Sequence, residues 1–278
     1  NDAPVLSSSS GDVTEFANTA LSFTANTVTG QMNFTDVDLN DVGHSAVVVS
    51  AARSGETDGL SLVSANALRS MLSVTGVEKA AGSGSGIVKW AFSAPDALFD
   101  YLAQGQKVTL SYQVQVSDGD GGTDTETVTI TVTGTNDRPT FLLGGAAIGI
   151  EQSNVTGSNA NQTYGGTLGF TDLDRDDVGH TATVSYEGAS GTTTGLSVSA
   201  IEAAVSVTAA KSVNSILGSV QWTFQAPDKV FDYLGRGETV TLSYKVTVND
   251  GEGAGNSTDT TTVTVTIIGT NDRPVIVN

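Results

Sequence analysis

Alternating apolar and polar residues predict that most of this chain forms β-strands. The alternation is clearest over residues 108–116 and 240–248, and it returns over residues 127–133 and 262–268. Val, Ile, Thr and Tyr dominate these segments, as is typical of strands that bury one face. Because the same pattern occurs in both halves of the chain, we expect two similar β-rich bodies.

Turn and core signals agree with these strands. Asp118-Gly119 and Asp250-Gly251 each follow the first strand of a pair and favour a turn into the next strand. Two aromatic residues spaced two apart occur once in each half, and we expect them in the core: Trp90 with Phe92, and Trp222 with Phe224.

One short helix is expected in each half. Ser64 is placed to cap a helix over residues 65–72, and Ser199 to cap one over residues 200–205. The remaining sequence has the composition of strands and of Gly/Ser/Thr loops. Many short antiparallel strands in a body of this size indicate an all-β fold, with two tandem Ig-like β-sandwich domains and Greek-key connections.

A junction motif divides the chain. Asn1-Asp2-Ala3-Pro4 returns as Asn136-Asp137-Arg138-Pro139 and as Asn271-Asp272-Arg273-Pro274, at intervals of 135 residues. We therefore predict domains at 1–135 and 136–270, with 271–278 as the start of the next linker. Because the motif stands at both ends, we expect an excerpt of a longer array, in which Pro139 and Pro274 stiffen the linkers.

Composition narrows the function classes. The net charge is −18, of which residues 1–135 carry −10 and residues 136–270 carry −8. Such a surface repels nucleic acid and anionic membranes and attracts cations. The chain has no cysteine, which excludes disulfides and thiolate metal sites, and no apolar run long enough to cross a bilayer. We expect a monomer that neither binds nucleic acid nor inserts into a membrane.

A longer motif carries a resemblance to a known family. Phe99-Asp-Tyr-Leu102 is followed by a strand ending in Asp-Gly, and then by a Thr/Val strand ending in Gly-Thr-Asn-Asp-Arg-Pro. The second half repeats this order from Phe231-Asp-Tyr-Leu234. This arrangement resembles the VCBS-type, cadherin-like tandem repeats of giant RTX-class, type I-secreted bacterial adhesins. The resemblance implies a cadherin-like sandwich, an extracellular location on the bacterial surface, a role in attachment and biofilm formation, and Ca²⁺ at the domain junctions.

Acidic residues recur at matching places in the two halves. Asp36 and Asp38 match Asp172 and Asp174, and residues two apart in extended chain point the same way. Carboxylates crowded together without a cation repel one another, and calcium takes six to eight oxygen ligands. Further matched pairs are Asn40-Asp41 with Asp176-Asp177, Glu15 with Glu151, Asp100 with Asp232, and Asp118 with Asp250.

The resemblance to cadherin-like repeats implies how these residues are shared between domains. The middle junction would use Glu15, Asp100, Asn136, Asp137, Asp172, Asp174 and Asp250. The first junction would use Asn1, Asp2, Asp36, Asp38 and Asp118, and the last Glu151, Asp232, Asn271 and Asp272. Unlike cadherin linkers, the linker here has no further Asp before Asn-Asp, which leaves the number of ions per junction open.

Calcium binding is not the sole reason for acids to recur at these places. Asp and Asn are common in turns and caps, and acidic surfaces also confer solubility. An EF-hand does not fit, because Asp41 stands where that loop needs glycine. The segment 118–124 resembles a glycine-rich RTX repeat but occurs once, so a local ion there is a minor alternative.

The remaining chemistry favours no enzyme. His44 and His180 occupy matching places, and we expect each to shape its acidic loop by a hydrogen bond rather than to act in catalysis. Thr127, Thr129, Thr131 and Thr133 suggest the exposed face of a strand rather than a binding array. We predict that no lysine occupies equivalent places in the two halves, and we therefore do not expect a lysine crosslink that both halves share.

The sequence thus predicts calcium-stiffened extender repeats of an adhesin that project a distal binding domain. Their partners would be calcium ions and neighbouring repeats of the same chain. The alternative is a carbohydrate- or matrix-binding module of a secreted protein, which would need exposed aromatic residues.

Overall fold

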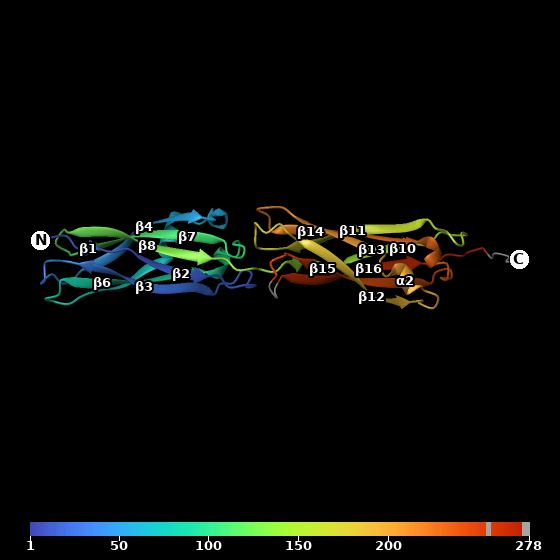
Figure 1. The fold of residues 1–278 in the computed structure, drawn as a ribbon, viewed down its shortest axis with the longest axis horizontal. Helices are drawn as coiled ribbons and strands as arrows, with labels where there is room; N and C mark the ends of the chain where they lie inside the picture. Colours follow the sequence, from blue (N-terminus) through green and yellow to red (C-terminus); the bar gives the residue numbers. More distant parts are fainter. Residues whose placement is uncertain (254–256, 274–278) are drawn as a thin grey trace. The chain divides into compact units, whose positions relative to one another are not determined.

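The computed structural model describes residues 1–253 and 257–273, and it divides the chain into two compact units, Asn1–Asp137 and Arg138–Asn278. Each unit is a sandwich of two four-stranded sheets (Figure 1). The predicted all-β fold with two tandem Ig-like sandwiches is confirmed. Pro274, to which we assigned linker stiffness, lies outside the described residues.

The first unit contains strands β1 to β8. One sheet has the order β1 (Val5–Leu6), β3 (Ala25–Thr35), β6 (Ser85–Pro95) and β5 (Leu72–Lys79). The other has the order β2 (Ser9–Thr14), β8 (Thr123–Thr133), β7 (Lys107–Ser117) and β4 (Ser45–Gly55).

The second unit repeats this order with β9 to β16. One sheet contains β9 (Thr140–Phe141), β11 (Asn161–Thr171), β14 (Leu217–Pro227) and β13 (Val205–Lys211). The other contains β10 (Gly145–Ile150), β16 (Thr258–Ile268), β15 (Thr239–Asn249) and β12 (Thr181–Gly191).

The first segment of each unit is split between the two sheets. In the first unit β1 pairs antiparallel with β3, and β2 then crosses over to pair parallel with β8. In the second unit β9 and β10 make the same crossing to β11 and β16. The remaining pairs of neighbouring strands are antiparallel, and the chain passes between sheets from β3 to β4 to β5, as Greek-key connections require.

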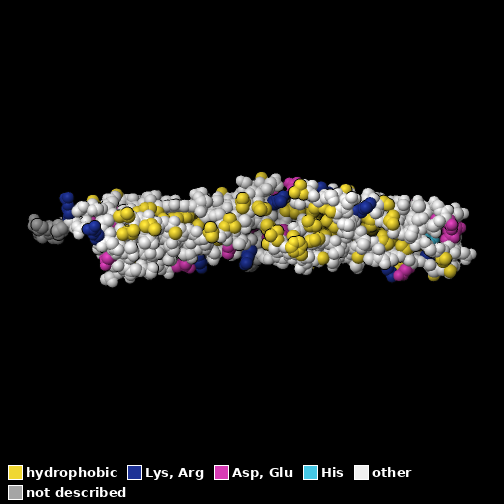
Figure 2. All heavy atoms as spheres, turned by 180° about the vertical axis from the view of Figure 1, so that it is seen from behind, with side chains coloured by type: hydrophobic (Ala, Val, Ile, Leu, Met, Phe, Trp, Pro, Cys, Tyr) yellow, Lys and Arg dark blue, Asp and Glu magenta, His cyan; other side chains and the backbone are white. Residues whose placement is uncertain are grey.

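Each unit has its own core between its sheets. The period-two pattern predicted this, because every second residue of β7 from Val108 to Val116 is fully buried. Trp90 and Trp222 are 1% and 3% exposed, which confirms their predicted place in the core. Figure 2 shows that groups of apolar side chains also remain on the surface.

Glycines leave room for the tryptophans. A Cβ added to Gly30 of β3 would lie 2.3 Å from the Trp90 ring, and one added to Gly166 of β11 would lie 3.0 Å from Trp222. The indole of each unit therefore packs flat over a strand position that lacks a side chain. Any larger residue at Gly30 forces Trp90 to move.

The helices are shorter than predicted. Ser64 caps α1 (Ala65–Ser70) by accepting a hydrogen bond from the Ala67 N–H at 3.2 Å. The second helix, α2 (Val198–Ile201), begins earlier than we predicted, so that Ser199 lies inside it and Ser197 stands at the cap. Both helices end early because the next strands, β5 and β13, already begin at Leu72 and Val205.

The described residues also form short 3-10 helices, η1 (Asp58–Leu60), η2 (Asp96–Leu98) and η3 (Asp228–Val230). Within the described residues, no helix is both long enough and apolar enough to span a bilayer.

Candidate metal centres

Each unit carries acidic residues at both ends of its sandwich. In the first unit β3 connects the two ends, because Asp96 donates its N–H to the Thr24 carbonyl before the strand and Asp36 follows its last residue. Eleven extended residues span roughly 35 Å. We call the group around Asp36 the amino-end cluster and the group around Asp96 the carboxyl-end cluster, and we use the same names for the corresponding groups of the second unit.

The amino-end cluster of the first unit lies on the loop after β3. One carboxylate oxygen from each of Asp36, Asp38 and Asp41 lies within 4.8 Å of the others. The Asp38 N–H donates to Asp36 Oδ1 at 2.8 Å, and the Asp2 N–H donates to Asp38 Oδ2 at 2.6 Å. Acidic side chains gather at the corresponding end of this unit, on the right of Figure 2.

Asp118 joins this end of the unit through the turn after β7. Its Oδ1 accepts from the N–H groups of Asp120 and Gly122, and its Oδ2 accepts from Asn1 Nδ2 at 3.1 Å. Burial would raise the pKa of Asp118, but these hydrogen bonds outweigh it and lower the pKa. Asn1, Asp2, Asp36, Asp38 and Asp118, which we predicted to act together, are therefore linked by hydrogen bonds in two groups, around Asp38 and around Asp118.

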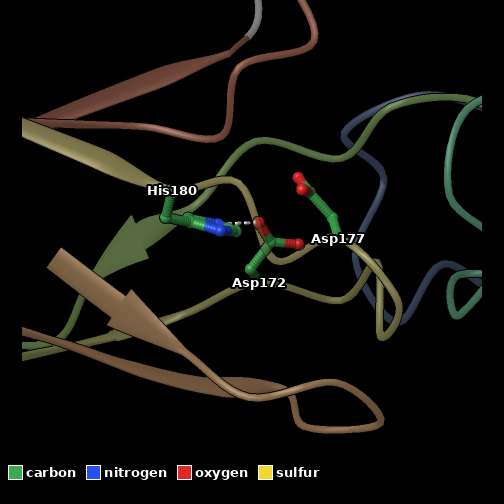
Figure 3. A group of neighbouring side chains, drawn as sticks. All are labelled: Asp172, Asp177 and His180. Carbon is green, nitrogen blue, oxygen red and sulfur yellow. Dashed lines mark hydrogen bonds and ion pairs between the residues drawn. The ribbon is translucent and has the colours of Figure 1, made fainter.

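The amino-end cluster of the second unit brings Asp172, Asp177 and His180 together, with one possible ligand atom from each within 4.8 Å of the others (Figure 3). The Asp174 N–H donates to Asp172 Oδ1 at 2.9 Å. Asp177 Oδ2 is buried and has no hydrogen-bond partner among the described residues. Burial raises the pKa of Asp177, and the charges of Asp172 and Asp250 raise it further.

The histidines fix one aspartate in each amino-end cluster. His180 Nε2 lies 2.6 Å from Asp172 Oδ2, and His44 Nε2 lies 2.7 Å from Asp36 Oδ2. Each imidazole also stacks on a core phenylalanine, Phe170 or Phe34. The prediction that the histidines shape the acidic loops by hydrogen bonding is confirmed.

A lysine lies behind each acidic loop. Lys79 ends β5 and donates from Nζ to the Asp38 and Asp41 carbonyls at 2.9 and 2.7 Å. Lys211 ends β13 and donates to the carbonyls of Asp174 and Asp177, both at 2.6 Å. The prediction that no lysine recurs between the copies is wrong, because these two occupy equivalent places.

The carboxyl-end cluster of the first unit is more deeply buried. Glu15, Asp96 and Asp100 offer oxygens within 4.8 Å of one another, and Glu15 is only 2% exposed. Thr135 donates its N–H and its hydroxyl to Glu15 Oε2 at 2.7 and 2.8 Å. Asp137 accepts from the Asn18 N–H beside this group, with Asn136 preceding it in the chain.

Two oxygens of this cluster have no donor. Glu15 Oε1 and Asp100 Oδ1 are buried without a hydrogen-bond partner among the described residues. The other oxygen of Asp100 accepts from the Leu21 N–H at 2.8 Å. Burial raises the pKa of Asp100, and the charge of Asp96 adds to that effect.

The second unit repeats this arrangement with Glu151, Asp232 and Asp272, whose oxygens lie within 4.8 Å of one another. The Thr270 N–H donates to Glu151 Oε2 at 2.8 Å, and the Gly157 N–H donates to Asp232 Oδ2 at 2.7 Å. Among the described residues, Glu151 Oε1 and Asp232 Oδ1 again lack a partner. Asn271 contributes its carbonyl, which accepts from the Asn154 N–H.

The two glutamates are poorly accommodated as anions. Burial raises the pKa of Glu15 to about 7, and Asp137 and Asp96 add to this, although the Thr135 hydrogen bonds oppose it. Burial also raises the pKa of Glu151 to about 7, and Asp272 and Asp228 add to it. At neutral pH and above, each cluster therefore holds a carboxylate whose charge is incompletely compensated.

Sequence reasoning missed Asp96 and Asp228, which are fully buried in the carboxyl-end clusters. Asp96 Oδ1 accepts from the Phe16 N–H and Asn26 Nδ2, and Asp228 Oδ1 accepts from the Gln152 N–H and Gln162 Nε2. The signal was present, because Ala-Pro-Asp recurs at 94–96 and 226–228. Proline is tolerated there since each motif ends a strand and opens a 3-10 turn.

The structure groups the predicted ligands within units. Glu15, Asp100 and Asp137 lie together in the first unit, and Asp172 lies with Asp174 in the second. Asp250 accepts from the Glu252 N–H at 3.0 Å and acts on the pKa of Asp177. That ligands from both units share one ion stays a prediction.

The donor set of these clusters selects a class of metal. Carboxylate oxygens dominate all four, and hard cations such as Ca²⁺ and Mg²⁺ prefer oxygen ligands. In the part of the chain that the structure describes, the imidazoles at the amino ends, His44 and His180, already bind Asp36 and Asp172. The clusters thus fit calcium chemistry better than transition-metal chemistry.

Comparisons with known proteins find similarity among solved structures, at low sequence identity. No protein-family model and no curated protein matches the sequence. Human CDH23 EC21-23 is 15% identical with a TM-score of 0.42, over 94% of this chain and 67% of that chain. Protocadherin gamma B2 extracellular cadherin domains 3-6 are 18% identical with a TM-score of 0.42, over 98% of this chain and 53% of that chain.

A fimbrial protein is also similar. CfaE, the adhesive subunit of the CFA/I fimbria of enterotoxigenic Escherichia coli, is 10% identical with a TM-score of 0.37, over 92% of this chain and 86% of that chain. The chain spans about half of the protocadherin structure that it matches.

Proposed function

We propose that this chain is a pair of extender repeats from a bacterial surface adhesin, and that its acidic clusters bind Ca²⁺. The resemblance of the Phe-Asp-Tyr-Leu and Gly-Thr-Asn-Asp-Arg-Pro motifs to adhesin repeats supports the role and the extracellular location. The chain would work as a monomer, with neighbouring repeats and calcium ions as its partners. Its task would be to project a distal binding domain in attachment and biofilm formation.

One observation carries the metal assignment. Glu15 Oε1 and Glu151 Oε1 are buried, lack a hydrogen-bond partner among the described residues, and occupy equivalent places in the two units. Burying an ionised carboxylate without compensation is costly, and a solvated surface residue would not be held this way. A divalent cation would supply the missing positive charge.

Particular residues would hold the ions. At the carboxyl end of the first unit these are Glu15, Asp96, Asp100 and Asp137, with the Asn136 carbonyl or amide as a further oxygen. At the amino end of the second unit they are Asp172, Asp174, Asp177 and Asp250. The second carboxyl end offers Glu151, Asp228, Asp232 and Asp272, and the first amino end offers Asp36, Asp38, Asp41 and Asp118.

The proposed mechanism is electrostatic. When calcium is bound, the ligands on both sides of Asn136-Asp137 share ions, and bending at the linker is restricted. When calcium is removed, carboxylates repel and the linker loosens. Scattering profiles with calcium and with chelator should therefore differ, and profiles that superimpose would argue against stiffening.

Thermal melting tests the metal assignment itself. For a site with a dissociation constant near 10 μM, millimolar calcium stabilises the folded state by about 2.7 kcal/mol. We expect a large rise of the melting temperature with calcium and a smaller one with magnesium, which demands stricter octahedral geometry. Asp172→Asn with Asp174→Asn should remove part of the rise, whereas Asp12→Asn, at an exposed position of β2, should leave it intact.

The carbohydrate-binding alternative loses both tryptophans as candidates and keeps Phe23, which is 88% exposed. Trp90 and Trp222 are buried in the cores, so neither can stack on a sugar. A melting temperature that does not respond to calcium would nevertheless return attention to a passive spacer or to glycan binding.

A further inference from the structure

Lys79 and Lys211 form a feature that the calcium assignment leaves unexplained. Both stand at the last residue of an edge strand, β5 or β13, and both direct the ammonium group into the loop that carries the aspartates. Lys211 is only 9% exposed. Lysine is seldom buried this deeply unless its charge is paired.

The contacts go to the backbone of the loops, not to the carboxylates. Lys211 Nζ donates to the carbonyls of Asp174, Arg175 and Asp177, at 2.6, 3.3 and 2.6 Å. An ammonium has three protons and no acceptor, so these three carbonyls use its full capacity.

The lysine also closes a turn. The Asp177 N–H donates to the Asp174 carbonyl at 3.2 Å, and that same carbonyl accepts from Lys211. In the first unit the Asp41 N–H and Lys79 Nζ likewise share the Asp38 carbonyl. The turn sets the spacing between Asp38 and Asp41 in the first loop and between Asp174 and Asp177 in the second.

We propose that Lys79 and Lys211 are positioning residues, whose ammonium groups hold the aspartate loops in the ligand-presenting conformation before any cation binds. This inference rests on the proposed calcium function. Three or four aspartates on one short loop repel one another, and without an internal cation the loop would open. The lysine supplies that cation on the backbone side and so lowers the ordering cost of calcium binding.

If the lysine acted on calcium through its charge alone, its removal would change the calcium affinity in the opposite direction. A fixed positive charge near the loop should weaken calcium binding by repulsion, and its removal should then strengthen binding, more so at low salt. Positioning predicts weaker binding after removal at every salt concentration. Groups that orient metal ligands typically contribute 10- to 100-fold to metal affinity, so the repulsion and positioning hypotheses differ in sign and not only in size.

The experiment is a calcium titration of the full chain followed by the amide resonances of residues 172–180. Lys211→Met removes the ammonium but keeps most of the side-chain volume, and Lys211→Arg keeps the charge but replaces the compact ammonium by a planar guanidinium. Lys245→Met is the matched control, because it removes the same charge from an exposed position of β15. Lys79→Met tests the same role at the less buried lysine of the first unit.

We expect Lys211→Met and Lys211→Arg each to raise the calcium midpoint of these resonances at least tenfold at both 50 and 300 mM salt. Lys245→Met should leave the midpoint unchanged. Hydrogen exchange of residues 172–178 in chelator should become faster in both Lys211 variants, while exchange in β14 and β15 stays slow. Lys79→Met should act in the same way on residues 36–42.

Different results separate the two proposals. If the parent resonances do not respond to calcium, the calcium function fails and the positioning role fails with it. If the parent responds but Lys211→Met binds calcium equally well or more tightly, only the positioning role is overturned. If Lys211→Arg binds like the parent while Lys211→Met binds more weakly, a cation of either shape holds the loop, which overturns the specific fit of the ammonium group to the three carbonyls.

Discussion

Glu15→Gln offers the sharpest test of the metal assignment, because its effect on stability should reverse sign with calcium. The Glu15 carboxylate is buried, and its Oε1 lacks a donor among the described residues. Glutamine keeps the shape and can still accept from Thr135 through its amide oxygen. Its NH₂ group would then offer protons to the neighbouring carboxylates of Asp96 and Asp100.

The magnitude follows from the raised pKa of Glu15. A pKa of about 7 instead of 4.5 means that the ionised form is disfavoured in the folded unit, by about 3 kcal/mol. At pH 8 in chelator, Glu15→Gln should recover about 1–3 kcal/mol, which corresponds to a rise in melting temperature of roughly 4–12 °C. In calcium the variant loses a charged ligand and should melt below the parent.

The assay is calorimetric melting at pH 8 in chelator and in millimolar calcium. Glu151→Gln, the equivalent change in the second unit, identifies which transition belongs to which unit. Glu56→Gln is the charge control, because Glu56 is exposed, and it should change neither transition by more than about 0.5 kcal/mol.

Two outcomes would refute the reasoning. Destabilisation by the same amount in both conditions would mean that the carboxylate is a purely structural acceptor for Thr135. Stabilisation by the same amount in both conditions would mean that no cation relies on this carboxylate. Only the reversal of sign is compatible with a calcium ligand at Glu15.

Three further predictions follow from the structure. Glu15 and Glu151 have raised pKa values near 7, so their protonated forms contribute fully to stability below about pH 4.5, and this contribution is lost as the pH rises towards 7. The melting temperature in chelator should therefore fall between pH 5 and 8, and calcium should abolish that fall. His180→Phe leaves buried Asp172 Oδ2 without its partner and should cost about 1–3 kcal/mol in urea unfolding, with or without calcium, whereas a smaller loss for His180→Gln would support the hydrogen-bonding role. Gly30→Ala should cost about 1–3 kcal/mol through its clash with Trp90, and Gly166→Ala clearly less, since its added Cβ meets Trp222 at a longer distance; equal urea midpoints for the two variants would contradict this.

The fold was predictable because its signals are local. Period-two patterning located β7, β8, β15 and β16 to within a few residues, and Asp-Gly marked the turns between them. Helix boundaries were less predictable, because the apolar residues after Ser70 serve equally well in a helix or a strand. Tertiary pairing of Leu72 with Phe92 of β6 decides for the strand.

The candidate sites were only partly predictable, because their geometry depends on contacts distant in sequence. Repetition identified Glu15 and Asp100, yet nothing local shows that Asp96 lies close to both of them and is completely buried. The backbone role of Lys79 and Lys211 was hidden for the same reason, since it depends on β5 and β13 passing behind the acidic loops. A comparison of the two copies at every polar position would have found both.

Structural, solubilising and cation-binding explanations apply to different acidic residues of this chain. Asp36, Asp96 and Asp118 each accept hydrogen bonds from backbone N–H groups in turns or strand ends, so a structural role accounts for much of their recurrence. Solubility accounts for neither glutamate, because a charge that promotes solubility must be exposed, and Glu15 and Glu151 are each 2% exposed. Burial without a donor, repeated at one place in both units, is what a cation site requires. A substitution of Asp172 removes a possible ligand and a turn hydrogen bond at the same time, so its effect on stability has two causes. Glu15→Gln removes the charge but keeps the hydrogen-bond acceptor. The carboxyl-end clusters are therefore the better place to test calcium binding.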